Sequence, residues 1–81
     1  MSVDPRWSFV RVVPDGQCFK LDGIDVWQHK WIDTKERAHV EDPLYHREFT
    51  FEVYEIRVDA KVLRFAAGEF SNCMWGFYTA D

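Results

Sequence analysis

Residues 49–78, FTFEVYEIRVDAKVLRFAAGEFSNCMWGFY, decide the fold class of this chain. Apolar and polar residues alternate from Phe49 to Val58, which is the period of a β-strand. Turn signals at Asp59-Ala60 and Ser71-Asn72 divide the remainder into two further strands. The stretch therefore predicts a three-stranded antiparallel meander.

The apolar face of the first of these strands changes once along its length. Its apolar residues have odd numbers up to Val53 and even numbers from Tyr54 onward. A shift of phase by one residue predicts a β-bulge between Val53 and Tyr54, which would bend the strand and keep its apolar side chains on one core. We therefore expect a long, curved strand.

The last two strands have no polar face, although a sheet with one face in water should carry polar residues at every second position. Small residues, such as Gly68 and Gly76, leave room for a ring to approach the backbone. Three covers could bury the second face. They are an N-terminal hairpin that brings Trp7, Trp27 or Trp31 over the glycines, a second copy of the chain, or a small ligand.

The N-terminal half is more ambiguous. Residues 7–13 and 17–21 flank the turn signal Pro14-Asp15-Gly16 and predict a hairpin, and residues 24–32 alternate like a further strand. Residues 33–46 are polar, so we expect a loop there, with at most one helical turn between Thr34 and His39. The sequence thus predicts a mainly β fold, a single domain over residues 1–81, with five to six strands in an antiparallel sheet or barrel-like arrangement.

Composition excludes several classes of partner. The formal net charge of -4 opposes binding to nucleic acid or to an anionic membrane surface, and no run of eighteen apolar residues could span a membrane. The first ten residues lack the apolar run of a signal peptide, and only Cys18 and Cys73 are available for redox chemistry. We therefore expect a cytoplasmic protein with two free thiols.

No catalytic, metal or cofactor motif is present in the sequence. His29, His39 and His46 are spaced by ten and seven residues, which matches no pattern of metal ligands, so we expect neither a metal nor a cofactor. Glu52, Glu55 and Glu69 are expected to face solvent or to pair with nearby arginines. The sequence favours binding over catalysis, and it identifies no catalytic residue.

The C-terminal stretch FTFEVYEIRVDAKVLRFAAGEFSNCMWGFYTAD, residues 49–81, resembles small uncharacterised proteins encoded by the mobile gene cassettes of bacterial integrons. This resemblance implies a compact bacterial protein of the cytoplasm, often a homo-oligomer, with an accessory role and no assigned activity. It supplies no catalytic residue, and it does not extend to the N-terminal half.

From these observations we expect a small accessory protein that acts by binding, with a second copy or another protein as its partner. Aromatic side chains dominate the energetics of such contacts. One alternative is a small-molecule-binding protein, or a small enzyme with a Glu or His as its acid-base group, whose aromatic pocket is roofed by Trp27 and Trp31. Another is an inhibitor or immunity-type protein whose acidic surface meets a basic partner. The predicted contact residues are Arg64, Phe65, Phe70, Trp75, Phe77, Tyr78, Trp27 and Trp31.

Overall fold

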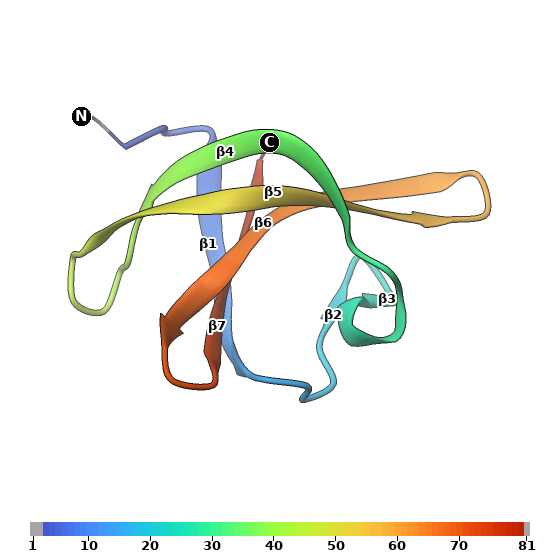
Figure 1. The fold of residues 1–81 in the computed structure, drawn as a ribbon, viewed down its shortest axis with the longest axis horizontal. Coiled ribbons are helices and arrows are strands. Elements are labelled where there is room, and N and C mark those ends of the chain that lie inside the picture. The colour runs from blue at the N-terminus through green and yellow to red at the C-terminus, as the bar shows by residue number, and fades with distance from the viewer. Residues whose placement is uncertain (1–2, 81) are drawn as a thin grey trace.

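Five long strands form one antiparallel sheet in the computed structural model, which describes residues 3–80. The mainly β fold and the C-terminal meander of β5, β6 and β7 are as the sequence predicts. A second sheet of two short strands and one 3-10 turn follow β1 in the chain (Figure 1). In the sheet order the strands are β1 (Trp7–Pro14), β7 (Met74–Ala80), β6 (Lys61–Ser71), β5 (Glu48–Val58) and β4 (Ile32–Glu41); the smaller elements are β2 (Lys20–Leu21), β3 (Ile24–Asp25) and η1 (Val26–Gln28).

The five-stranded sheet curls until its two edge strands approach each other. In Figure 1, β4 arches across the molecule and overlies the start of β1. The backbone N–H of Asp4, just before β1, donates a hydrogen bond of 2.9 Å to the carbonyl of His39 in β4. The sheet is therefore a partly closed barrel with an inner and an outer face.

Each face of the sheet has its own apolar core. The inner core joins side chains of both edge strands, and the outer core lies between the sheet and the segment 17–31, which contains β2, β3 and η1. Because successive side chains of a strand point to opposite faces, β6 and β7 contribute to both cores. Buried inner-core residues are Trp7, Ala38, Val40, Phe51, Val53, Ala66, Phe70 and Tyr78; buried outer-core residues are Val13, Phe19, Leu21, Ile24, Val26, Ile56, Leu63, Phe65, Ala67 and Phe77.

These two cores also explain the change of apolar phase in β5, and they correct its interpretation. The pairing of β5 with β6 runs without a shift from Glu52 opposite Ala67 to Val58 opposite Lys61, so the bulge predicted at Val53 and Tyr54 is wrong. The strand instead contributes to the inner core first and to the outer core afterwards. The irregularity lies in β4, where the register shifts between Asp33 and Arg37.

The predicted N-terminal hairpin is wrong, because β1 pairs with β7 and not with residues 17–21. Residues 24–32 are not one strand either, since β3 ends at Asp25 and η1 begins at once. The Asp25 carboxylate accepts a hydrogen bond of 3.1 Å from the backbone N–H of Trp27 and thereby caps this turn. The one helical turn is therefore at residues 26–28, not between Thr34 and His39.

Residues 33–41, expected as part of a loop, belong to the edge strand β4 (Ile32–Glu41). Ala38 and Val40 point into the inner core, and charged residues occupy most of the remaining positions. None of the helical segments among residues 3–80 is long and apolar enough to cross a membrane.

Phenylalanine rings, not the expected tryptophans, fill the space above the glycines of the meander. A Cβ atom on Gly68 would lie 2.3 Å from Cδ1 of Phe51, and one on Gly76 would lie 2.4 Å from Cζ of Phe70. Both contacts are far shorter than van der Waals separation, so these positions require glycine for its size. Trp27 and Trp31 pack against the outer core instead.

Candidate functional site

The loop of residues 42–47, between β4 and β5, is held by a buried carboxylate. Asp42 accepts hydrogen bonds from the backbone N–H of Leu44 at 2.8 Å and from Nη2 of Arg47 at 3.3 Å. Its own backbone N–H donates to the carbonyl of Arg47 at 2.7 Å, and its carbonyl accepts from the N–H of His46 at 2.8 Å. Since the Asp42 side chain is fully buried, these bonds offset the cost of removing its charge from water. The loop therefore has a defined shape.

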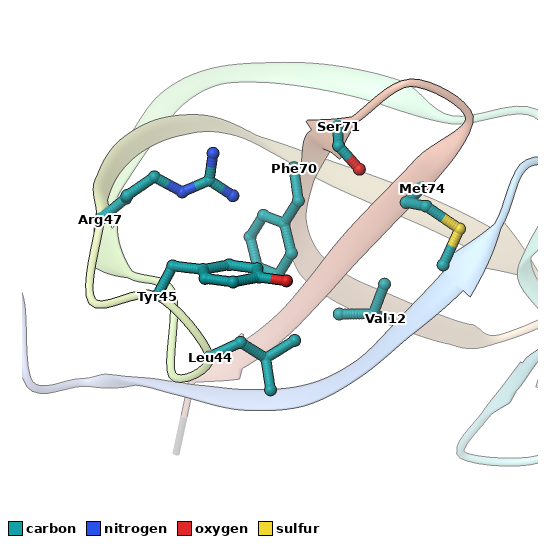
Figure 2. A pocket seen from close by; sticks show the side chains of 7 residues that line it. All are labelled: Val12, Leu44, Tyr45, Arg47, Phe70, Ser71 and Met74. Carbon is teal, nitrogen blue, oxygen red and sulfur yellow. The ribbon is translucent and has the colours of Figure 1, made fainter.

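This loop forms one wall of an open, mostly apolar cavity of about 520 Å³. Figure 2 shows Leu44 and Tyr45 on one side of it and Val12 and Met74 on the other. The cavity thus opens between the second half of β1 and the β4–β5 loop. Its full lining comprises Val12, Leu44, Tyr45, Arg47, Phe70, Ser71 and Met74.

Polar groups lie at two places on the rim of the cavity. The Arg47 guanidinium lies 5.1 Å from the ring centroid of Tyr45 and 5.3 Å from that of Phe49, so two cation–π contacts hold it beside the opening. The Ser71 hydroxyl stands at the end of β6 (Figure 2). A molecule bound here would meet apolar walls and a few hydrogen-bonding groups at the entrance.

The wall formed by the loop is unusually exposed for its composition. Leu44 and Tyr45 keep 64% and 71% of their surface exposed, the largest fractions among the exposed large apolar residues that the structure describes. Exposed apolar side chains that border a concave surface are typical of binding sites. The structure therefore places an accessible apolar site at this end of the sheet.

The structure distributes the predicted contact residues among three environments. Phe65 and Phe77 are buried in the outer core, and Phe70 and Tyr78 in the inner core, so these four side chains do not form an exposed contact surface. Only Phe70 also lines the cavity. Arg64 is exposed and forms an ion pair with Glu36.

The remaining three, Trp27, Trp31 and Trp75, form a half-buried aromatic cluster against the outer core. The ring centroids of Trp27 and Trp31 are 5.1 Å apart, and those of Trp31 and Trp75 are 5.6 Å apart. The indole N–H of Trp31 donates to the carbonyl of Val26 at 2.7 Å. Trp31 packs directly on Phe65, and Trp27 on Phe77. These two rings therefore cover the outer core, whereas the sequence offered them as the roof of an aromatic pocket.

Sequence reasoning missed Leu44, Tyr45 and Arg47 because the whole polar segment was read as solvated loop. One signal was available, since Leu44-Tyr45 is a pair of large apolar residues inside an otherwise polar stretch. Their approach to Val12 and Met74 depends on the curl of the sheet, which no local pattern specifies.

Two tyrosines among the described residues are held in the neutral form. Burial, followed by the charges of Asp42 and Glu41, raises the pKa of Tyr78 to about 12. Its hydroxyl donates a hydrogen bond of 2.7 Å to the carbonyl of Glu41, which fixes the end of β4 beside the loop. Burial and the hydrogen bond to Glu52 likewise raise the pKa of Tyr54 to about 12.

A second hollow, of about 260 Å³, lies on the outer face beside Tyr54 and Trp75. Of its two glutamates, Glu52 accepts the Tyr54 hydroxyl at 2.6 Å and lies 3.7 Å from Nη2 of Arg37. Glu52 is therefore already engaged by groups of its own chain. The second glutamate, Glu69, is exposed at the rim.

Two of the histidines and Cys18 form local pairs. His39 lies 3.0 Å from the Thr50 hydroxyl, and His46 lies 3.4 Å from a carboxylate oxygen of Glu41. The Cys18 thiol donates to Asp25 at 3.3 Å, and this hydrogen bond raises the pKa of Cys18, which disfavours its reactive thiolate. Within residues 3–80, no three His, Cys, Asp or Glu side chains gather in a way that could hold a metal ion.

Comparison with known proteins found no matching family model, no matching curated protein and no matching solved structure.

Proposed function

We propose that this protein acts by binding, and that it takes an apolar group of its ligand into the cavity between β1 and the β4–β5 loop. The observation that carries this proposal is the open cavity of about 520 Å³ with its exposed apolar wall. Ligand sites in proteins are concave, mostly apolar and about 300–1,000 Å³ in volume. The cavity has each of these properties.

The hydrogen bonds around Asp42 support the proposal further, because a preformed site loses less conformational entropy on binding. The rim groups, Arg47 and Ser71, offer donors to polar atoms at the outer end of the ligand. The accessory role implied by the sequence resemblance stays a prediction that agrees with a binding function.

A fluorescent apolar probe tests the proposal. N-phenyl-1-naphthylamine brightens in apolar surroundings and can be excited outside the tryptophan band. We expect it to bind the unmodified protein and to lose at least tenfold in affinity in Ser71→Trp, whose indole would occupy the cavity from its exposed rim.

The matched control is Val62→Trp, which adds the same ring at an exposed position near the tip of the β5–β6 hairpin, away from the cavity. This variant should bind the probe like the unmodified protein. Equal binding by Ser71→Trp and Val62→Trp, or no binding by the unmodified protein, would refute the proposal.

A further inference from the structure

The two edges of the curled sheet differ in how well they are protected. The outer edge of β4 carries a register shift, a left-handed Lys35 (φ 69°) and several charges, and His39 accepts a backbone hydrogen bond from Asp4. Such features prevent a further strand from pairing. The edge of β4 is therefore closed to another chain.

The edge of β1 has much less protection. Among residues 3–80, no strand pairs with the side of β1 that faces away from β7. From Ser8 to Val13 the strand has one charged residue, Arg11, while Phe9 and Val10 keep 38% and 39% of their surface exposed. This strand edge can accept main-chain hydrogen bonds from another polypeptide.

The open edge and the cavity are adjacent. Val12 belongs to β1 and lines the cavity, as does Met74 of the neighbouring β7 (Figure 2). A strand added to β1 would lie about 4.8 Å from it, and every second side chain of that strand would point to the inner face. Since the cavity lies on the inner side of β1, one of these side chains would enter it.

We propose that the ligand is an extended segment of a partner protein, which pairs with the edge of β1 and places one apolar side chain in the cavity. This inference rests on the proposed function and names its ligand class. In strand addition, main-chain hydrogen bonds supply affinity, and a pocket beside the strand selects the side chain. The edge and the cavity supply these two parts.

The geometry of β1 favours a short foreign segment over a second copy of the chain. The register shift between Phe9 and Arg11, together with Pro14, leaves only residues 11–13 as a regular edge. In a second copy the same shift would interrupt the opposite strand as well. Its Val12 and Val13 side chains are packed in its own cores and could not enter the cavity.

A peptide panel tests the inference. The probes are Ac-Thr-Val-Xaa-Val-Thr-amide, with each amino acid in turn at Xaa, and binding is followed by two-dimensional NMR of the backbone amides. Peptides with Leu, Met, Phe or Trp at Xaa should bind at least tenfold more tightly than those with Asp, Lys or Gly. Bound peptide should slow hydrogen exchange at β1 amides, and Ser71→Trp should abolish the preference for apolar Xaa.

N-methylation then separates strand pairing from simple insertion. Successive amides of a strand point in opposite directions, so only one alternate set faces β1. A peptide methylated at the first and third amides and one methylated at the second and fourth should differ at least tenfold in affinity.

Each other outcome overturns the inference. If no peptide binds but N-phenyl-1-naphthylamine does, the cavity takes small molecules and only the proposed function stands; if neither binds, both fail. Equal affinity of the two methylated peptides would mean insertion without strand pairing. Protection of β1 amides that rises with protein concentration alone would assign the edge to a second copy.

Discussion

Gly68 and Gly76 show how single residues determine the packing of this small sheet. Both lie in the C-terminal meander, and each supports the face of a phenylalanine ring of the inner core, Phe51 or Phe70. The sequence indicated that a ring would approach these glycines but not which one. The answer depends on strand register: Glu52 of β5 pairs with Ala67 of β6, so the preceding residue, Phe51, lies across from Gly68.

Gly68→Ala tests this close packing. Where space allows, replacing glycine by alanine stabilises a protein by about 0.4–1 kcal/mol. Here the new methyl group would overlap the Phe51 ring, so we expect the free energy of unfolding to fall by about 1–3 kcal/mol. Urea denaturation followed by tryptophan fluorescence measures the change. An unchanged or increased midpoint would show that the ring can move aside at no cost.

At the scale of elements, the sequence was reliable for the β5–β6–β7 meander and unreliable for the other strands. The β5–β6–β7 meander follows from alternation and two turn signals, although the second turn falls at Asn72 and Cys73, one residue later than predicted. In contrast, β1 pairs with β7 at the far end of the chain, which no local pattern reveals.

The strand β4 was missed for a different physical reason. One side of this edge strand faces the inner core only through Ala38 and Val40 near its end, and the rest is charged and exposed. Such a sequence has no apolar alternation by which a strand can be recognised. Missing β4 also hid where the loop that follows it lies in the fold, and this loop supplies three of the seven residues that line the cavity, Leu44, Tyr45 and Arg47.

The segment 17–31 is the element that covers the outer face, and Trp31 anchors it. The Trp31 ring lies 5.1 Å from the ring centroids of both Tyr54 and Phe65, and its N–H bonds to the carbonyl of Val26. Replacing a packed tryptophan by alanine costs about 3–5 kcal/mol. Since Trp31 is half-buried, we expect Trp31→Ala to lower the free energy of unfolding by about 3 kcal/mol.

His29→Ala is the matched control for Trp31→Ala, because His29 is an exposed residue of the same segment. A surface substitution of this kind should change the free energy of unfolding by less than about 0.5 kcal/mol. Thermal unfolding followed by circular dichroism would compare the two variants. Similar stability of Trp31→Ala and His29→Ala would mean that the cover contributes little to the fold.

At the scale of the whole molecule, one chain covers both apolar faces of the β6–β7 hairpin. The segment 17–31 covers the outer face, and the curl of the sheet brings β4, β5 and the start of β1 over the inner face. A homo-oligomer was expected because the second face needed a cover. The chain itself supplies that cover, so this reason for an oligomer no longer applies.

The state of association is therefore open to a direct prediction. Within residues 3–80, few large apolar side chains stay exposed. Those of β1 border an edge whose register shift opposes pairing with an identical strand. We expect sedimentation equilibrium at about 100 micromolar, a concentration that would saturate an interface of micromolar strength, to give the mass of one chain, 9.7 kDa. A dimer mass would contradict this expectation, and Val10→Lys would then locate the contact. Because a lysine on an exposed edge opposes strand pairing, a dimer built on β1 should dissociate in that variant, whereas one built on another surface should persist.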